Sequence, residues 1–226
     1  RRFGFDLSTA FQSNVFAYDI DESKIASCRS RIAELDLSLP LEGNIRQADF
    51  LTADIQSFDV VVGNPPYIRY EQIPAELLSS YKQQFHTFHY RADLYILFFE
   101  KTLKHLNPGG HHCFICSNRW LKNEYGKKLR GWIAQSFRLE SIVSLEKSSD
   151  AFQEDVLAYP AITLISNARP GSSFSFSELT SISQLGKDTG RSLPAPVLAD
   201  WSSVFNRVQS DDTLVTIEEM GFMVGI

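Results

Sequence analysis

Short apolar runs alternate with amphipathic segments along the first two-thirds of the chain. Apolar residues recur at helical spacing over 21–35, and again over 92–106, where Asn107-Pro108-Gly109-Gly110 then favours a break. The pattern predicts helices at 21–35, 92–106 and 125–136, strands at 14–20, 44–50, 58–63 and 110–117, and a closing pair of strands at 139–145 and 161–165. This alternation is typical of an α/β fold with a mainly parallel sheet and helices on both faces.

The composition changes near Asn167. Pro170-Gly171-Ser172-Ser173 opens a serine-rich stretch, and Pro194-Ala195-Pro196 interrupts it further along. Turn-forming residues of this kind concentrate in linkers. We therefore predict one domain over 1–167, followed by a linker and the start of a second domain over 168–226.

Bulk properties exclude a membrane protein. Of the 226 residues, 43% are hydrophobic and 22% are charged, which is ordinary for a soluble globular chain. No apolar run approaches the roughly 20 residues that span a bilayer, and Arg1-Arg2 is followed by mixed residues, not by the apolar block of a signal peptide. We expect a cytoplasmic location.

The three cysteines do not form a disulfide framework. Cys113 and Cys116 make a CxxC sequence preceded by His111-His112, but a structural zinc site needs four well-spaced ligands. Because these residues lie in an apolar run typical of a buried strand, we predict no metal site.

The formal net charge of −5 argues mildly against nucleic-acid binding, which depends on clustered basic residues. A local basic cluster does exist, formed by Lys122, Lys127, Lys128 and Arg130. Net charge governs non-specific attraction and not chemistry, so it excludes no enzyme class. It indicates that a main DNA-reading surface would lie elsewhere.

Candidate chemistry concentrates in Asn64-Pro65-Pro66-Tyr67, the Asn-Pro-Pro-Tyr motif, which directly follows the strand predicted at 58–63. In an open parallel sheet, ligands bind beyond the carboxyl ends of the strands, and Asn64 falls at that edge. A strand followed by a Pro-Pro turn is the simpler interpretation, but the four-residue sequence in this context is too specific to favour it.

The motif suits transfer of a group to the exocyclic N6 of adenine, a poor nucleophile because its lone pair is delocalised into the ring. The Asn64 carboxamide oxygen and the Pro65 carbonyl can accept both amino hydrogens and direct the lone pair outward. The proline ring restricts where that carbonyl points, and Tyr67 offers a flat face for an extruded base. No strong general base is needed, since the proton can leave after attack.

With these residues in place, the region from about Val15 to Ile165 resembles the amino-group DNA methyltransferases, specifically the gamma-class adenine enzymes of restriction–modification systems. The resemblance implies a Rossmann-like fold, S-adenosylmethionine as cofactor and double-stranded DNA as substrate. It also implies that 1–167 is a partial catalytic domain and that 168–226 opens a target-recognition domain, with 214–226 as its first segment.

The resemblance also implies roles for individual residues at the cofactor. Asp19, at the end of the first predicted strand, matches the acid that binds the ribose hydroxyls, whereas Asp21 is expected to cap the following helix. Asp49 and Phe50 match the position that binds the cofactor's adenine amino group. Phe98 resembles the aromatic residue at the adenine ring.

A second segment resembles the family's target-binding region. Tyr125 would be the second aromatic residue against the flipped adenine, opposite Tyr67. The DNA-contacting positions implied on either side are Arg69, Asn118, Lys127 and Lys128, with Arg130 also near phosphates.

One feature of the family is missing from the sequence. The glycine-rich loop that cradles the methionine part of the cofactor has no counterpart before Asn14, where Gly4 stands alone. We therefore expect the remainder of the parent chain, or a partner subunit, to complete the fold. The fragment alone is expected to bind S-adenosylmethionine weakly and to be inactive.

Three alternatives remain open. Protein glutamine methyltransferases share the Asn-Pro-Pro-Tyr motif, although the Tyr125-Gly126-Lys127-Lys128 segment fits the DNA enzymes better. An RNA adenine methyltransferase is the second alternative, and an inactive methyltransferase-like module that binds DNA or a partner is the third.

Overall fold

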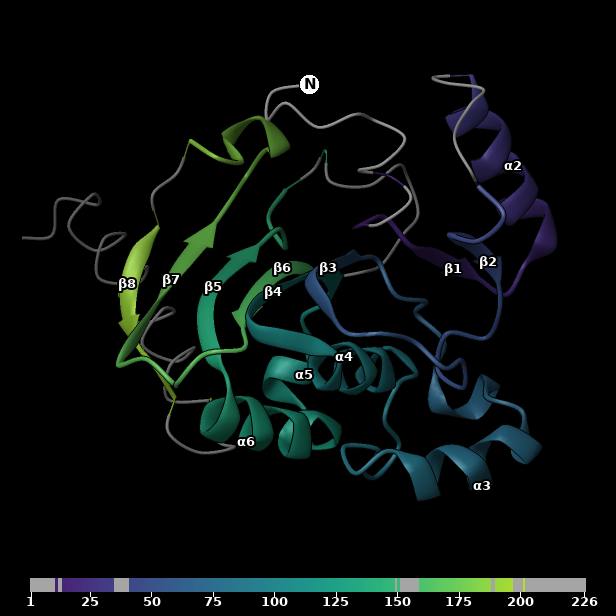
Figure 1. The fold of residues 1–226 in the computed structure, drawn as a ribbon. Coiled ribbons are helices and arrows are strands. Elements are labelled where there is room, and N and C mark those ends of the chain that lie inside the picture. Colours follow the sequence, from purple (N-terminus) through teal and green to yellow (C-terminus); the bar gives the residue numbers. More distant parts are fainter. Residues whose placement is uncertain are drawn as a thin grey trace, which may run out of the picture. The chain divides into compact units, whose positions relative to one another are not determined.

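The computed structural model describes residues 11, 14–34, 41–148, 150, 159–187, 190–196 and 201 (Figure 1). The chain divides into two compact units, Arg1–Ile55 and Gln56–Ile226. Each unit is described by itself.

The first unit contains two short parallel strands, β1 (Ala17–Asp19) and β2 (Ile45–Gln47), and the helix α2 (Glu22–Ala33). Asp21 caps α2, because its carboxylate accepts the Ser23 backbone N–H at 2.8 Å. The prediction for Asp21 is therefore confirmed. Ile25 and Ile45 are buried together with Phe11 and form the small core of this unit. Both strands are shorter than predicted.

The second unit is built on a six-stranded sheet with the order β3-β4-β6-β5-β7-β8. The strands are β3 (Phe58–Gly63), β4 (Leu106–Ser117), β5 (Arg138–Ser144), β6 (Pro160–Ser166), β7 (Ser173–Glu178) and β8 (Arg191–Pro194). The pairs β3–β4 and β5–β7 are parallel, whereas β6 runs antiparallel to both its neighbours and β8 runs antiparallel to β7. The sheet is therefore mixed, and the predicted closing pair is β5 and β6.

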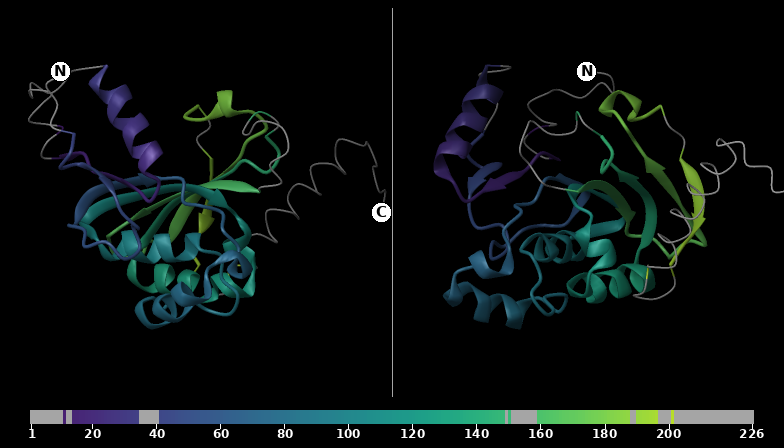
Figure 2. Two further views of the ribbon diagram at one scale, coloured as in Figure 1. Left: turned by 90° about the vertical axis from the view of Figure 1, so that its right-hand side faces the viewer. Right: turned by 180° about the vertical axis from the view of Figure 1, so that it is seen from behind.

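The helical segments of this unit are η1 (Tyr70–Gln72), α3 (Ala75–Gln84), α4 (Tyr95–Lys104), α5 (Arg119–Lys122), η2 (Glu124–Gly126), α6 (Lys127–Ser136) and η3 (Ile182–Gln184). Helices α4, α5 and α6 lie together along one face of the sheet (Figure 2). Their apolar side chains make the core with the sheet: Leu97 and Phe99 from α4, Leu129 and Ile133 from α6, and Ile142 from β5 are all fully buried.

The helix predicted at 92–106 is shorter than expected. Helix α4 begins at Tyr95 and ends at Lys104, and the segment 106–110 that was expected to break the helix belongs to β4. The domain boundary predicted after residue 167 falls between β6 and β7, and β7 continues the same sheet by pairing with β5. That boundary stays a prediction, and the predicted opening of a target-recognition domain at 214–226 lies outside the described residues.

No helix in the described part of the chain combines the length and the apolar character that crossing a bilayer requires.

Candidate active site

The Asn-Pro-Pro-Tyr motif leaves the sheet at the carboxyl end of β3, as predicted. Gly63 immediately before it pairs with Phe114 of β4, and a Cβ at Gly63 would lie 2.9 Å from the Phe114 ring. Only glycine therefore fits without displacing that ring. The side chain of Pro65 is buried, whereas Asn64 and Tyr67 are exposed, so the turn is anchored by its proline and presents its amide and its phenol outward.

Tyr67 stands against the edge of Tyr95, the first residue of α4. Their ring centroids are 6.4 Å apart with an interplanar angle of 89°. Partial burial, with a smaller contribution from Cys116, raises the pKa of Tyr67 to about 12, so its hydroxyl stays protonated at neutral pH. The residue after Tyr67 is also fixed, since the Ile68 carbonyl accepts the Leu94 N–H at 2.8 Å.

Tyr125, in η2, is buried, with 9% of its surface exposed. Its hydroxyl lies 2.7 Å from the hydroxyl of Tyr95 and donates to Asp93 Oδ2 at 3.2 Å. Burial raises the pKa of Asp93, an effect that the Tyr125 hydrogen bond only partly offsets. The role of Tyr125 against a target base stays a prediction. In this structure its ring has little free surface, whereas Tyr67 has an open one.

The residues after β4 form a second polar edge beside this group. Asn118 is buried, and its side-chain amide donates to Glu146 Oε2 at 3.0 Å while its backbone N–H donates to the Tyr159 carbonyl at 2.6 Å. The guanidinium of exposed Arg119 lies 5.9 Å from the centre of the Tyr159 ring. Asn118 is therefore tied to the segments that follow β5 and precede β6, and its exposed neighbour Arg119 presents the charge.

The predicted basic residues divide into two groups. Arg69, Lys127 and Lys128 are exposed, and Lys127 lies 3.4 Å from Glu124. Arg130 is buried and donates to the Trp120 carbonyl at 2.6 Å, so the prediction that it lies near phosphates is wrong. Its charge is used to satisfy backbone carbonyls at the end of α5.

In the first unit, the two predicted cofactor acids lie at one edge. β1 and β2 are parallel, with Asp19 opposite Gln47, and the Ala48 N–H donates to the Asp19 carbonyl. Asp19 Oδ1 accepts the Asp21 N–H at 2.9 Å, and Asp49 Oδ1 accepts the Leu51 N–H at 3.0 Å. Each carboxylate is thus oriented by a backbone N–H two residues along the chain.

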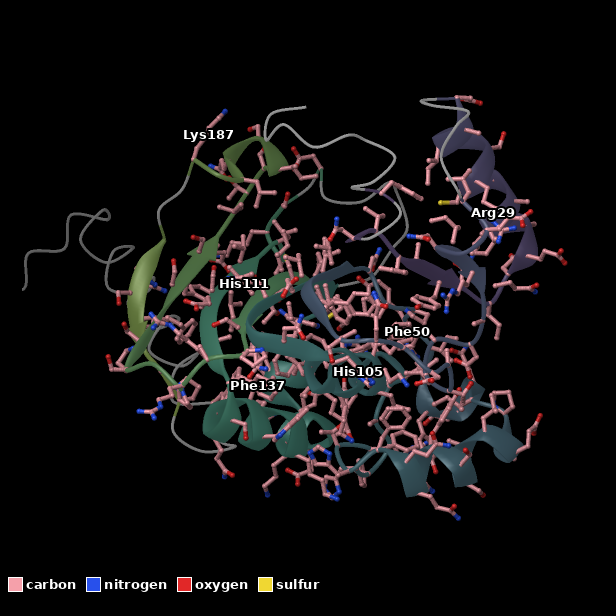
Figure 3. All side chains as sticks on the ribbon, in the orientation of Figure 1. Arg29, Phe50, His105, His111, Phe137 and Lys187 are labelled. Carbon is pink, nitrogen blue, oxygen red and sulfur yellow. The ribbon has the colours of Figure 1, made fainter. Side chains whose placement is uncertain are left out.

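Two aromatic residues, Phe50 and Phe98, were predicted to bind the cofactor. Phe50, labelled in Figure 3, packs against Tyr18 within the first unit, and their ring centroids are 5.7 Å apart. Phe98 of α4 is partly exposed, although Leu97 and Phe99 on either side of it are fully buried. The contact of Phe98 with the cofactor stays a prediction.

Comparison with known proteins identifies the family. Residues 13–152 match the family described as the Eco57I restriction-modification methylase. This chain belongs to that family.

Two curated relatives agree with the assignment. The type II methyltransferase M.XhoI of Xanthomonas vasicola is 41% identical over 182 residues, which cover 75% of this chain and 33% of the relative. The type II methyltransferase M.PaeR7I of Pseudomonas aeruginosa is 48% identical over 128 residues, which cover 56% of this chain and 22% of the relative. The chain thus spans a third or less of the length of these relatives.

A solved structure from Listeria monocytogenes, assigned to the class I S-adenosylmethionine-dependent methyltransferases, superposes with a TM-score of 0.57 at 16% identity. The superposition covers 90% of this chain and 57% of the Listeria protein's chain. The mixed sheet flanked by helices is therefore the Rossmann-like methyltransferase fold, and both the predicted fold class and the predicted family are confirmed.

In this methylase, sequence patterns did not predict a role for two residues near the motif. Asp93 and Tyr95 contact residues some thirty positions away, and no local pattern announces such contacts. The one sequence feature that could have pointed to them is their polarity within the otherwise apolar segment Ala92–Leu97.

Proposed function

We propose that the protein containing this chain is an S-adenosylmethionine-dependent methyltransferase of a restriction–modification system that methylates N6 of adenine in double-stranded DNA. The family and the relatives support the general activity. The choice of adenine N6 as the methylated atom rests on the Asn-Pro-Pro-Tyr motif at the carboxyl end of β3, where Asn64 and Tyr67 are exposed.

The chemistry follows from which groups the motif exposes. The Asn64 carboxamide oxygen and the Pro65 carbonyl are acceptors, and an amino nitrogen has two hydrogens to donate. Engaging both hydrogens draws the lone pair out of the ring and toward an electrophile. The contribution of this chain is alignment and hydrogen-bond electrostatics, which act without a strong base.

The residues of the first unit suit the adenosine half of S-adenosylmethionine, which supplies the electrophilic methyl group. Asp19 would accept the ribose hydroxyls and Asp49 the adenine amino group, since ionised carboxylates only accept hydrogen bonds. Backbone N–H groups already orient both carboxylates. For Phe98, contact with the adenine ring is proposed from the family resemblance alone.

The exposed basic residues suit the DNA backbone. Lys127 and Lys128 begin α6 and closely follow Tyr125, and Arg69 lies two residues after Tyr67, so all three present charge close in sequence to the two tyrosines. Phosphate contacts of this kind position a duplex without reading its sequence.

Substitution of Asn64 tests the proposal in the full-length protein. Asn64→Ala removes one of two acceptors, and we expect transfer of a labelled methyl group to DNA to fall by about a hundredfold or more. The matched control is Asn107→Ala at the opposite end of the β3–β4 pair, where the amide donates to Asp59 Oδ1 at 2.9 Å. Equal activity of Asn64→Ala and wild type would eliminate the proposed role of Asn64.

A further inference from the structure

One buried side chain connects the two tyrosines that were predicted to contact the base. Tyr95, which is 1% exposed, presents its ring to Tyr67 and its hydroxyl to Tyr125. Tyr67 belongs to the turn after β3, and Tyr125 belongs to the segment after β4. Tyr95 is therefore a bridge between two loops that are nearly sixty residues apart in sequence.

The direction of the hydrogen bonds in this bridge is determined by Asp93. An ionised carboxylate can only accept, and a phenol has a single hydrogen to donate. Because Tyr125 donates to Asp93 Oδ2 at 3.2 Å, Tyr95 must be the donor in its 2.7 Å hydrogen bond with Tyr125. The result is a directed chain from Tyr95 through Tyr125 to Asp93.

Both phenols keep their protons in this environment. Burial raises the pKa of Tyr125 well above its ordinary value, and burial together with the neighbouring Tyr125 does the same for Tyr95. Both hydroxyls therefore remain donors at neutral pH. Consecutive hydrogen bonds of this kind polarise one another and strengthen the whole set.

The bridge is also fixed to the backbone of the motif segment. Leu94, between Asp93 and Tyr95, donates its N–H to the Ile68 carbonyl at 2.8 Å. Ile68 directly follows Tyr67. The turn before α4 is consequently held to the Asn-Pro-Pro-Tyr segment by a main-chain bond as well as by the ring contact.

We propose that Tyr95 and Asp93 are positioning residues that hold Tyr67 and Tyr125 in a fixed mutual arrangement for the target adenine. The inference rests on the proposed function and on the predicted base contacts of Tyr67 and Tyr125, and it adds two residues that act through these tyrosines. A ring held in place before the base arrives loses less conformational freedom on binding, and a site aligned in advance lowers the barrier to transfer.

The alternative is that the bridge only stabilises the fold, since buried hydroxyls need partners wherever they occur. The two roles differ in what they change. If the hydrogen bond between Tyr95 and Tyr125 only stabilises the fold, its loss lowers the melting temperature. If it positions the two tyrosines, its loss reduces base extrusion and turnover in protein that is still folded.

The test uses full-length protein with two DNAs. One carries 2-aminopurine at the adenine that the wild type methylates and reports extrusion, and the other is unmodified and serves to measure kcat. Tyr95→Phe keeps the ring against Tyr67 and removes the hydroxyl. We expect the fluorescence gain on extrusion and kcat each to fall by about tenfold, the amount one hydrogen bond is worth, with the KM for S-adenosylmethionine unchanged. Asp93→Asn keeps an acceptor oxygen and should retain most activity, whereas Asp93→Ala should resemble Tyr95→Phe.

Tyr81→Phe is the matched control, because Tyr81 of α3 is 3% exposed and also loses a buried hydroxyl. It should leave extrusion and kcat unchanged. Should Tyr95→Phe fail to fold, Tyr125→Phe breaks the same bond from the other side. Combining Tyr95→Phe with Tyr125→Phe should be no worse than Tyr125→Phe alone, because Tyr125→Phe already removes the hydrogen bond that Tyr95→Phe removes.

The outcomes separate the two proposals. Wild-type extrusion and kcat in Tyr95→Phe, or additive losses in the double variant, would overturn the positioning role and leave the proposed function standing. A wild-type protein that methylates no adenine in DNA would overturn the proposed function, and the positioning role with it.

Discussion

His112, in β4, is a buried group that the fold holds in its neutral form. It has no exposed surface, and neither ring nitrogen has a hydrogen-bond partner among the described residues. The ring packs against Phe99 and Phe114, with centroids 5.0 and 4.1 Å away. Burial lowers the pKa of His112 from 6.5 to about 3, because a charged imidazole would lose hydration without gaining a partner. We predict that His112→Leu weakens the acid sensitivity of the fold.

The size of the effect follows from linkage. The unfolded chain binds a proton at this position below its ordinary pKa of 6.5, whereas the folded chain does not until the pH nears 3. Acid therefore favours the unfolded state across this window. At about pH 5 this shifts the unfolding equilibrium by a factor of about 30, equal to about 2 kcal/mol, whereas at about pH 7.5 the factor is about one and the free energy is close to zero. Leucine also removes two unpaired nitrogens, so the variant should be about 1 kcal/mol more stable at neutral pH.

Urea unfolding of the 226-residue chain measures this directly. All three tryptophans lie in the second unit, so their fluorescence reports on the unit that contains His112. Between about pH 7.5 and about pH 5, the wild type should lose about 2 kcal/mol more stability than His112→Leu. His111→Leu, on the exposed face of the same strand, controls for loss of an imidazole from β4. Parallel pH responses in wild type and His112→Leu would refute the reasoning.

Two further substitutions probe the packing beneath the site. Gly126→Ala should destabilise the second unit by about 3 kcal/mol, because its Cβ would overlap the Trp120 carbonyl, whereas Gly43→Ala has no atom within 4 Å and should be nearly neutral; thermal unfolding of both variants checks this, and equal melting temperatures would contradict it. Glu100→Gln should cost about 2 kcal/mol, because one carboxylate oxygen accepts the Thr87 N–H at 2.7 Å and hydroxyl at 2.6 Å while the other accepts the His86 N–H at 3.1 Å, and glutamine keeps only one acceptor oxygen. Urea unfolding near neutral pH measures that cost, and unchanged stability would mean that these bonds are replaced by water.

Local pattern predicted the elements that carry the chemistry. The strand 58–63 was predicted with the bounds it has, because a β-branched run between a polar residue and Asn-Pro-Pro leaves little choice of register or end. The cap at Asp21 was equally predictable, since an acid before an amphipathic run satisfies free N–H groups.

Features that depend on contacts between distant residues could not be predicted from the sequence. Arg130 lies in a basic segment that is typical of an exposed helix face. It is nevertheless buried, because its guanidinium donates to the carbonyls of Trp120 and Asn123. The link between Tyr95 and Tyr125 joins residues thirty positions apart, so helical spacing could not reveal it. Residues 92–94 satisfy a helical pattern but form the turn that binds Ile68.

The central claim is that this methylase modifies the exocyclic nitrogen of adenine. The most direct test treats unmodified DNA with the full-length protein and labelled S-adenosylmethionine, then digests the DNA to nucleosides and separates them by mass. The account predicts that the label appears as N6-methyldeoxyadenosine and that it is lost in Asn64→Ala. Label in N4-methyldeoxycytidine or 5-methyldeoxycytidine, with none on adenine, would contradict it.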